Sequence, residues 1–198
     1  MTSPDALSRA LFDPADPPLR PLPRSVADLL LSLNAPPRLA AHLRAVHDVA
    51  HQLVVWTECR APGLTVDRTA VLFGAATHDI GKTEHPAELS GPGSRHEEAG
   101  RELLLAHGFS AGLARFAGTH GTWTAPGVTL EDLLVSTADK AWKNKRVPEL
   151  EDLVVARLVR ATGRPQWEEY LALDEVLERV GEVADQRLAF QASYPVLA

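Results

Sequence analysis

The sequence predicts an all-α protein, folded as a single-domain helical bundle, and three observations indicate this fold class. From Ser25 onward, apolar residues recur at the 3.6-residue spacing of helices in nearly every segment. Residues typical of helix starts and stops bound these segments, with serine, threonine, aspartate or proline before them and glycine or proline after them. Strand signals are almost absent, because the β-branched pairs Val54-Val55 and Val154-Val155 lie inside helical patterns.

The predicted helices follow one another with short connections. Ser25 is the expected N-cap of a short helix that ends at Leu33, before two consecutive prolines. A long helix then runs from Pro37 to Arg60, since proline is tolerated in the first turn, where an N–H group has no partner to lose. The remaining helices are expected over residues 67–78, 94–107, 110–118, 129–140, 149–162 and 171–191.

The helix over 94–107 carries the clearest boundary signals. Ser94 and Glu97 have the spacing of a capping box, in which the serine side chain and the glutamate side chain satisfy each other's backbone N–H groups. Gly108 suits the left-handed position that follows a last helical turn. We therefore expect Ser94 to be the N-cap of this helix.

Residues 1–24 differ from the remainder of the chain because they are rich in proline. Each proline removes a backbone donor and restricts the residue before it, which leaves little room for a helix. We therefore expect residues 1–24 to form an arm that lies extended on the domain or is partly disordered. A helical domain follows over 25–198, with a motif-bearing core over 38–146 and a C-terminal helical extension over 148–198. The last amphipathic helix is interpreted as a packing helix or the contact of a homodimer. The prolines of the arm are Pro4, Pro14, Pro17, Pro18, Pro21 and Pro23.

Composition excludes several classes of protein. The 198 residues are 45% hydrophobic and 23% charged, an ordinary globular mixture, and the net charge of −6 argues against a protein that coats nucleic acid. Cys59 is the only cysteine, so a disulfide within the chain and a cysteine-based zinc site are both excluded. No apolar run reaches the roughly 18–20 residues that span a bilayer, and the N-terminus lacks the pattern of a secretory signal. We expect a cytoplasmic protein without a membrane partner.

His78 and Asp79 stand side by side at the end of the helix predicted over 67–78. An imidazole and a carboxylate at a helix end can both reach one divalent cation. Gly81 then lets the chain turn away, and Lys82 places a positive charge where a phosphate could bind. Because such a pair also occurs by chance in soluble proteins, further ligands along the chain decide what it means.

The long helix over 37–60 offers three histidines. At 100° per residue, His42 falls on the edge of the apolar stripe that faces the core, whereas His47 and His51 lie farther round the helix. A ligand must point into the protein, so His42 is the better candidate. The alternative is a histidine on the flank of the helix that is hydrogen-bonded to a neighbour.

Three more candidate ligands lie on other predicted helices. Asp139 follows an apolar run within its helix, and a buried carboxylate there is costly unless it is paired or bound to a cation. The alternative is a carboxylate on the helix surface. His96 lies in the first turn of its helix, and His120 follows a short one.

The ordered set resembles the HD superfamily of metal-dependent phosphohydrolases, over roughly residues 38–146. The segment from His42 to Leu53 is similar to the first helix of that family, with valine four and alanine eight residues after the ligand histidine, which also favours His42. The Ala-Ala-Thr-His-Asp-Ile-Gly-Lys segment is similar to the signature after which the superfamily is named, and Ser-Thr-Ala-Asp-Lys matches its last ligand. The resemblance implies a bundle of the HD type. It implies one metal held by His42, His78, Asp79 and Asp139. The additional presence of His96 and His120 matches the subgroup of the family that holds two metals, in which Asp79 bridges the two.

Histidine and carboxylate ligands without thiolate suit Mn, Fe, Co, Ni, Zn or Mg. Such an ion lowers the pKa of a bound water towards roughly 7 and so provides a nucleophile at neutral pH. We assign Asp79 and Lys82 to catalysis, and Lys82, Lys140 and Lys143 to substrate binding, because these lysines follow the ligand residues directly. For the cluster that starts at Lys140, the alternative is a solvated helix end favoured by the helix dipole.

We therefore predict a metal-dependent phosphohydrolase that cleaves a phosphate ester or anhydride of a small molecule by metal-activated water, with one or two divalent ions. The resemblance implies that the substrate is a nucleotide. Two alternatives stay open: a mixed-valent di-iron oxygenase, which some HD proteins with the same six ligands are, and a non-catalytic regulator that binds a nucleotide. The chain lacks the Gly-Tyr-Pro motif of the cyclic-dinucleotide phosphodiesterases and the Glu-Asp pair of the guanosine-tetraphosphate hydrolases.

Overall fold

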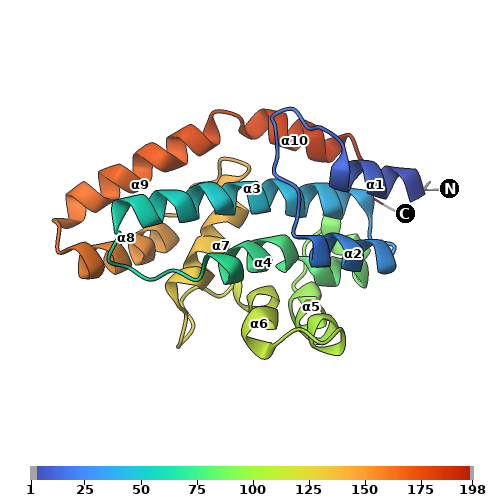
Figure 1. Cartoon of the computed structure of the whole chain (residues 1–198), viewed down its shortest axis with the longest axis horizontal. Coiled ribbons are helices and arrows are strands. Elements are labelled where there is room, and N and C mark those ends of the chain that lie inside the picture. The colour runs from blue at the N-terminus through green and yellow to red at the C-terminus, as the bar shows by residue number, and fades with distance from the viewer. Residues whose placement is uncertain (1–3, 197–198) are drawn as a thin grey trace.

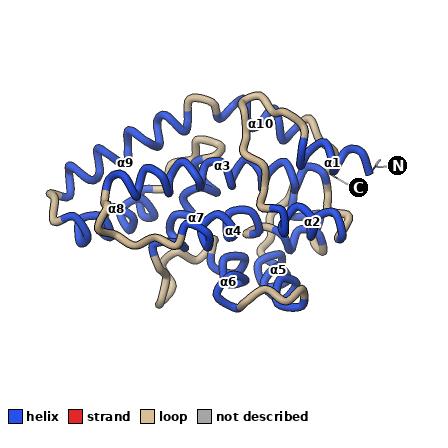
Figure 2. The backbone as a smooth tube through the Cα atoms, in the orientation of Figure 1, coloured by secondary structure: helices blue, strands red, loops and turns tan. Residues whose placement is uncertain are grey.

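The computed structural model describes residues 4–196, and every regular element within them is helical (Figure 2). The all-α prediction is therefore confirmed. The described residues form ten α-helices and two short 3₁₀ helices, η1 and η2. In chain order these are α1 (Pro4–Phe12), α2 (Arg24–Ser32), α3 (Pro37–Arg60), α4 (Arg68–Thr77), η1 (Ile80–Thr83), η2 (Pro86–Leu89), α5 (Arg95–Ala106), α6 (Ala111–Thr119), α7 (Leu130–Ala141), α8 (Pro148–Thr162), α9 (Gln166–Gly181) and α10 (Ala184–Ala192).

Helix α3 runs through the middle of the molecule, with α1, α4, α7, α9 and α10 packed around it (Figure 1). Apolar or small residues occupy most of its circumference, which is the pattern of a helix surrounded by other elements. Polar side chains on α3 are consequently buried as well, among them His42, Arg44, His47 and Asp48. Burial of such groups is unfavourable unless they have polar partners.

Two further helices, α4 and α7, pack against α3 and against each other. The start of α4 is fixed by Asp67, whose carboxylate accepts the N–H of Ala70 at 2.9 Å. The start of α7 is fixed by a capping box between Thr129 and Asp132, which pairs each side chain with the other residue's backbone N–H. These caps fix where the two helices begin, and α4 ends at Thr77, so that His78 follows it directly.

The expectation of a single helix over 171–191 is wrong. The chain forms α9 and α10 instead, and the two helices run in different directions (Figure 1). The break follows Gly181, where an added Cβ would lie 2.5 Å from Oδ1 of Asn144, and Val183 leaves the helical region with φ −111° and ψ 19°. The close approach of the loop after α7 therefore interrupts a pattern that is helical in the sequence.

The prediction that the arm has little helix is also wrong for its first part. Residues 4–12 form α1, which packs against α3, because the arm's other prolines all follow residue 12. Residues 13–23 are not helical and lie along the bundle. Helix α2 then begins at Arg24, with Pro23 rather than Ser25 at its N-cap. The division of the chain at residue 24 stays a prediction.

Arg44 of α3 fastens the arm to the bundle. It is 4% exposed, and its guanidinium group donates to carbonyl oxygens of the arm rather than to a carboxylate. Four such bonds give this buried cation polar partners, which its burial requires. The acceptors are the carbonyl groups of Ala10, Asp13, Leu19 and Arg20. Among the described residues, no helix is both long and apolar enough to cross a membrane.

Candidate metal centre

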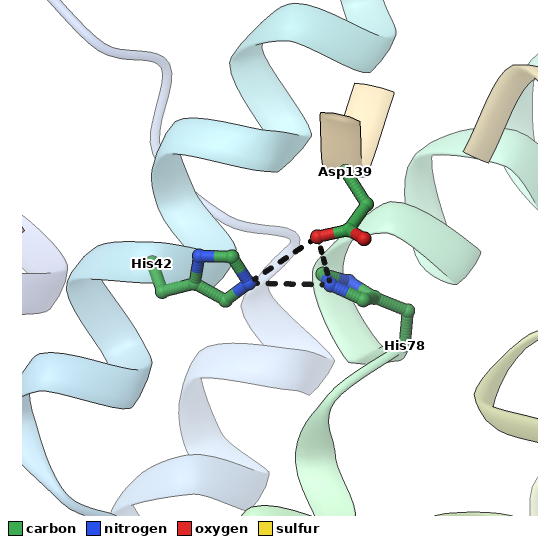
Figure 3. A group of neighbouring side chains, drawn as sticks. All are labelled: His42, His78 and Asp139. Carbon is green, nitrogen blue, oxygen red and sulfur yellow. Dashed lines mark hydrogen bonds and ion pairs between the residues drawn. The ribbon is translucent and has the colours of Figure 1, made fainter. Parts of the chain in front are cut away.

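His42, His78 and Asp139 come together from three helices and form the first group of candidate ligands (Figure 3). His42 lies on α3, His78 ends α4, and Asp139 lies on α7. The two Nε2 atoms are 3.2 Å apart, and Oδ1 of Asp139 lies 3.4 Å from Nε2 of His78 and 3.8 Å from Nε2 of His42. All three side chains are buried and aim their donor atoms at one point (Figure 3).

Asp79, His96 and His120 form a second group beside the first. Asp79 follows His78 in the chain, His96 lies in the first turn of α5, and His120 ends α6. Oδ1 of Asp79 is 3.0 Å from Nε2 of His96 and 3.5 Å from Nε2 of His120. The structure thus brings all six candidate ligands of the sequence into two neighbouring clusters, whereas His47 lies outside both.

The carboxylate of Asp79 faces both groups. While Oδ1 points at His96 and His120, Oδ2 lies 3.1 Å from Nε2 of His42 and 3.6 Å from Nε2 of His78. One carboxylate with an oxygen turned to each cluster has the arrangement of a ligand shared between two sites.

Backbone carbonyls fix the protonation of two of the imidazoles. Nδ1 of His78 lies 2.9 Å from the carbonyl oxygen of Ala75, and Nδ1 of His120 lies 3.0 Å from that of Ala117. Because a carbonyl only accepts, Nδ1 must carry the hydrogen in both rings. Burial lowers the pKa of His120 to about 4, so its ring is neutral at pH 7 and Nε2 presents a lone pair to the cluster.

Glu88 fixes the third imidazole. Its Oε2 atom lies 2.6 Å from Nδ1 of His96 and also accepts the backbone N–H of His96, while Oε1 accepts that of Arg95. The expected capping box is therefore wrong: Ser94 occupies the N-cap position without a side-chain hydrogen bond. Glu88 of η2 satisfies the first N–H groups of α5 instead, and the same carboxylate orients His96.

A glycine lets α5 approach the loop that carries Asp79. An added Cβ on Gly81 would lie 2.0 Å from the carbonyl oxygen of His96 and 2.5 Å from the backbone nitrogen of Gly100. No side chain fits in that space, so the turn of η1 against α5 requires glycine at residue 81. This contact sets the separation of Asp79 and His96.

Both carboxylates of the centre are held in the charged form. Burial alone would raise the pKa of Asp79, but the imidazoles of His78, His42 and His96 hold it well below the usual range. Burial likewise opposes charge on Asp139, and His78 and Lys140 hold its pKa well below that of a free aspartate. Two negative ligands and four imidazoles therefore face the same small volume.

Two lysines neutralise part of this charge. Nζ of Lys82 lies 2.5 Å from Oδ2 of Asp79, and Nζ of Lys140 lies 2.5 Å from Oδ2 of Asp139. Both lysines line a cavity of about 520 Å³ that opens over the two groups, as does the exposed Lys143. Arg146, the last member of the basic cluster in the sequence, is instead paired with Glu151 and Asp174 away from this cavity.

The cavity contains residues that sequence reasoning did not single out as part of the site. Glu88 and Glu97 add carboxylates, and Trp142 packs the edge of its ring against His42, with ring centroids 4.9 Å apart. Leu188 and Gln191 reach the cavity from α10. Glu97 follows His96 directly and Trp142 stands three residues after Asp139, but no motif marks either of them as part of the site. Glu88, Leu188 and Gln191 lie farther from any ligand in the chain and reach the cavity through packing.

The donor atoms fit divalent metal ions. Two ligands bonded to one ion at about 2.0–2.2 Å, at right or tetrahedral angles, lie about 3.0–3.5 Å apart, and the separations within both groups fall close to this range. Nε2 of His96 is buried and makes no well-aligned hydrogen bond among the described residues, although Oδ1 of Asp79 lies 3.0 Å away. Such an orphaned atom is unfavourable unless a ligand binds there. Each group is therefore positioned to hold a metal ion, and its nitrogen and oxygen donors suit first-row transition metals or Mg²⁺.

Comparisons with protein-family models, with curated proteins and with solved structures find no match to this chain.

Proposed function

We propose that this protein is a metal-dependent phosphohydrolase that cleaves a phosphate ester or anhydride of a small molecule. The observation that carries the proposal is the carboxylate of Asp79, which turns one oxygen to each of two histidine-containing groups. A pair of adjacent divalent sites that share a carboxylate is common among enzymes that transfer phosphoryl groups to water.

The order of the ligands along the chain supports the same proposal. His42, His78-Asp79, His96, His120 and Asp139 follow the order of the HD superfamily, in the subgroup that holds two metals. The all-helical bundle is compatible with that family. We accordingly propose an HD-type centre in which Asp79 bridges two ions and the substrate is a small phosphorylated molecule, with a nucleotide as the class implied by the resemblance.

Different residues of the chain have different roles in such a reaction. A bound divalent ion supplies an activated water and draws charge from a phosphoryl oxygen. Lys82 and Lys140 line the cavity beside the candidate ligands, where their ammonium groups can hold phosphate oxygens as point charges. Lys143 adds a third cation at the exposed side, so an anion meets positive charge along its path.

Phosphate release tests the proposal. Nucleoside mono-, di- and triphosphates are incubated with the protein and Mn²⁺, Co²⁺, Ni²⁺ or Mg²⁺, beside the variants Asp79→Ala and Asp152→Ala. We expect release by the unaltered protein and by Asp152→Ala, which removes an exposed carboxylate far from the cavity, and none by Asp79→Ala. Release that persists in Asp79→Ala would show that the reaction takes place elsewhere.

A second candidate function follows from the four imidazoles among the six ligands. A histidine-rich set also suits iron, and the resemblance includes proteins in which the same set holds a mixed-valent di-iron centre that activates oxygen. The absorption spectrum and oxygen consumption of the iron-loaded protein separate the two functions. Oxygen consumption by the iron-loaded protein, without phosphate release from any ester, would mean that the protein is an oxygenase and not a hydrolase.

A further inference from the structure

The cavity over the metal centre has two unlike walls. One wall carries the ligand groups with Lys82 and Lys140, and its charges are those of the two lysines and of Asp79 and Asp139. A second wall is made by Leu188 and Gln191 of α10 together with Trp142 at the end of α7, and these three side chains carry no charge. Helix α10 lies after residue 146, outside the part of the chain that carries the ligands.

Helix α10 is held firmly beside the cavity. Arg187, which is 1% exposed, donates from Nη1 to the carbonyl oxygen of Trp142 at 3.0 Å. Arg38, in the first turn of α3, donates to the carbonyl oxygen of Ala192, the last residue of α10, and to that of Tyr194 just beyond it. These bonds tie α10 to the two helices that supply His42 and Asp139, so its position relative to the metal centre is fixed.

Two groups on this wall have nothing in the protein to bind. Leu188 is 37% exposed although it borders a cavity, and leucine gains free energy when its apolar surface is covered. Gln191 is half-buried, and its side-chain amide makes no hydrogen bond to any described residue. An amide in that position presents a donor and an acceptor side by side.

We propose that α10 determines which phosphate esters the centre accepts, because Leu188 and Gln191 contact the organic part of the substrate. The proposal rests on the proposed function. Phosphate is common to all substrates and matches the charged wall. The α10 wall matches an organic group that has an apolar face and an edge with hydrogen-bond donors and acceptors, which a bare sugar phosphate or inorganic pyrophosphate lacks.

Ester pairs that differ only in the organic group test this inference. With the Mn²⁺-loaded protein, ribose 5-phosphate is compared with the four ribonucleoside 5′-monophosphates, which add a planar base to the same sugar and phosphate. We expect at least one base-containing ester to have the lower KM. Leu188→Ala and Gln191→Ala should each raise that KM about 3- to 10-fold, the effect of a lost uncharged contact, and leave ribose 5-phosphate unchanged.

Two variants serve as matched controls. Leu105→Ala removes a leucine with the same 37% exposure on α5, and Gln186→Ala removes an exposed glutamine of α10; neither side chain lines the cavity. Calorimetric titration with the four nucleosides, which carry no phosphate to release, gives Kd independently of turnover. We expect weaker binding of the preferred nucleoside in Leu188→Ala and Gln191→Ala than in the controls.

The outcomes separate the two proposals. If esters are hydrolysed without a preference for a base, or if the α10 variants behave like their controls, the role of α10 is refuted while hydrolysis stands. If no ester is hydrolysed, the proposed function fails, and the nucleoside Kd then tests the role of α10 by itself. Weaker nucleoside binding only in the α10 variants supports that role. Equal binding in all variants, or no binding at all, refutes it.

Discussion

Glu88 and His96 are joined by a hydrogen bond of 2.6 Å between Oε2 and Nδ1, and the same carboxylate accepts the first two N–H groups of α5. One side chain therefore begins the helix and orients a candidate ligand on it. Carboxylates that bind the second nitrogen of a metal-ligating histidine fix the ring and raise its basicity.

Replacing Glu88 by glutamine should weaken the second metal group selectively. We expect Glu88→Gln to lower the affinity of the Asp79, His96 and His120 group for Mn²⁺ by about 10- to 100-fold, the usual effect of losing such a partner. Equilibrium dialysis measures the affinity, and Glu98→Gln, which removes an exposed charge from α5, is the control. Equal affinities in the two variants would mean that Glu88 only begins the helix.

Removing Arg44 should release the arm. In Arg44→Met, the buried carbonyl groups of Ala10 and Leu19 and the part-buried ones of Asp13 and Arg20 lose this donor. Because each unpaired buried carbonyl costs about 1–3 kcal/mol, the free energy of unfolding should fall by roughly 2–4 kcal/mol. Urea denaturation measures the loss, and hydrogen exchange should rise first in residues 6–22. Arg160→Met, at an exposed arginine that has no ion pair with any described residue, should leave both measurements unchanged.

The stability of the protein should fall in mild acid because of His47. Burial lowers the pKa of His47 from 6.5 to about 4, so the unfolded chain takes up a proton at this residue before the folded protein does. The contribution of neutral His47 to the free energy of unfolding is therefore complete above pH 6.5. It is lost as the pH falls to about 4, which lowers the free energy of unfolding by up to roughly 3 kcal/mol.

His47→Leu removes this titration. Nδ1 of His47 is buried without a partner among the described residues, so the substitution breaks no hydrogen bond at that atom. Urea unfolding at pH 7, 6, 5 and 4 should show a smaller decrease in His47→Leu than in the unaltered protein. Parallel curves over that range would mean that His47 has an ordinary pKa in the folded state.

The helices of the fold were largely predictable from the sequence, because amphipathic periodicity and cap residues are local signals. The long helix over 37–60 matches α3 at both ends. The errors lie where a contact from elsewhere in the chain decides the outcome. Asn144 packs against Gly181 at the break between α9 and α10, and Glu88 replaces Ser94 as the partner of the first N–H groups of α5.

The candidate ligands were also visible in the sequence, because the chain has only eight histidines and the order of its histidine and aspartate motifs is distinctive. What surrounds them was not. Glu88 orients His96 through a loop whose path no local pattern reveals, and Leu188 and Gln191 enter the cavity from a helix that the sequence places at the far end of the chain. Such residues are brought to the centre by packing alone.

The most direct test of this account is the number of metal ions bound per chain, measured by elemental analysis after dialysis against Mn²⁺. If Asp79 is shared between two sites, the unaltered protein binds two ions. His42→Ala and His96→Ala, which remove one ligand from each group, should each bind one, and Asp79→Ala should bind none. A single ion in the unaltered protein, or two ions retained by Asp79→Ala, would contradict the shared centre.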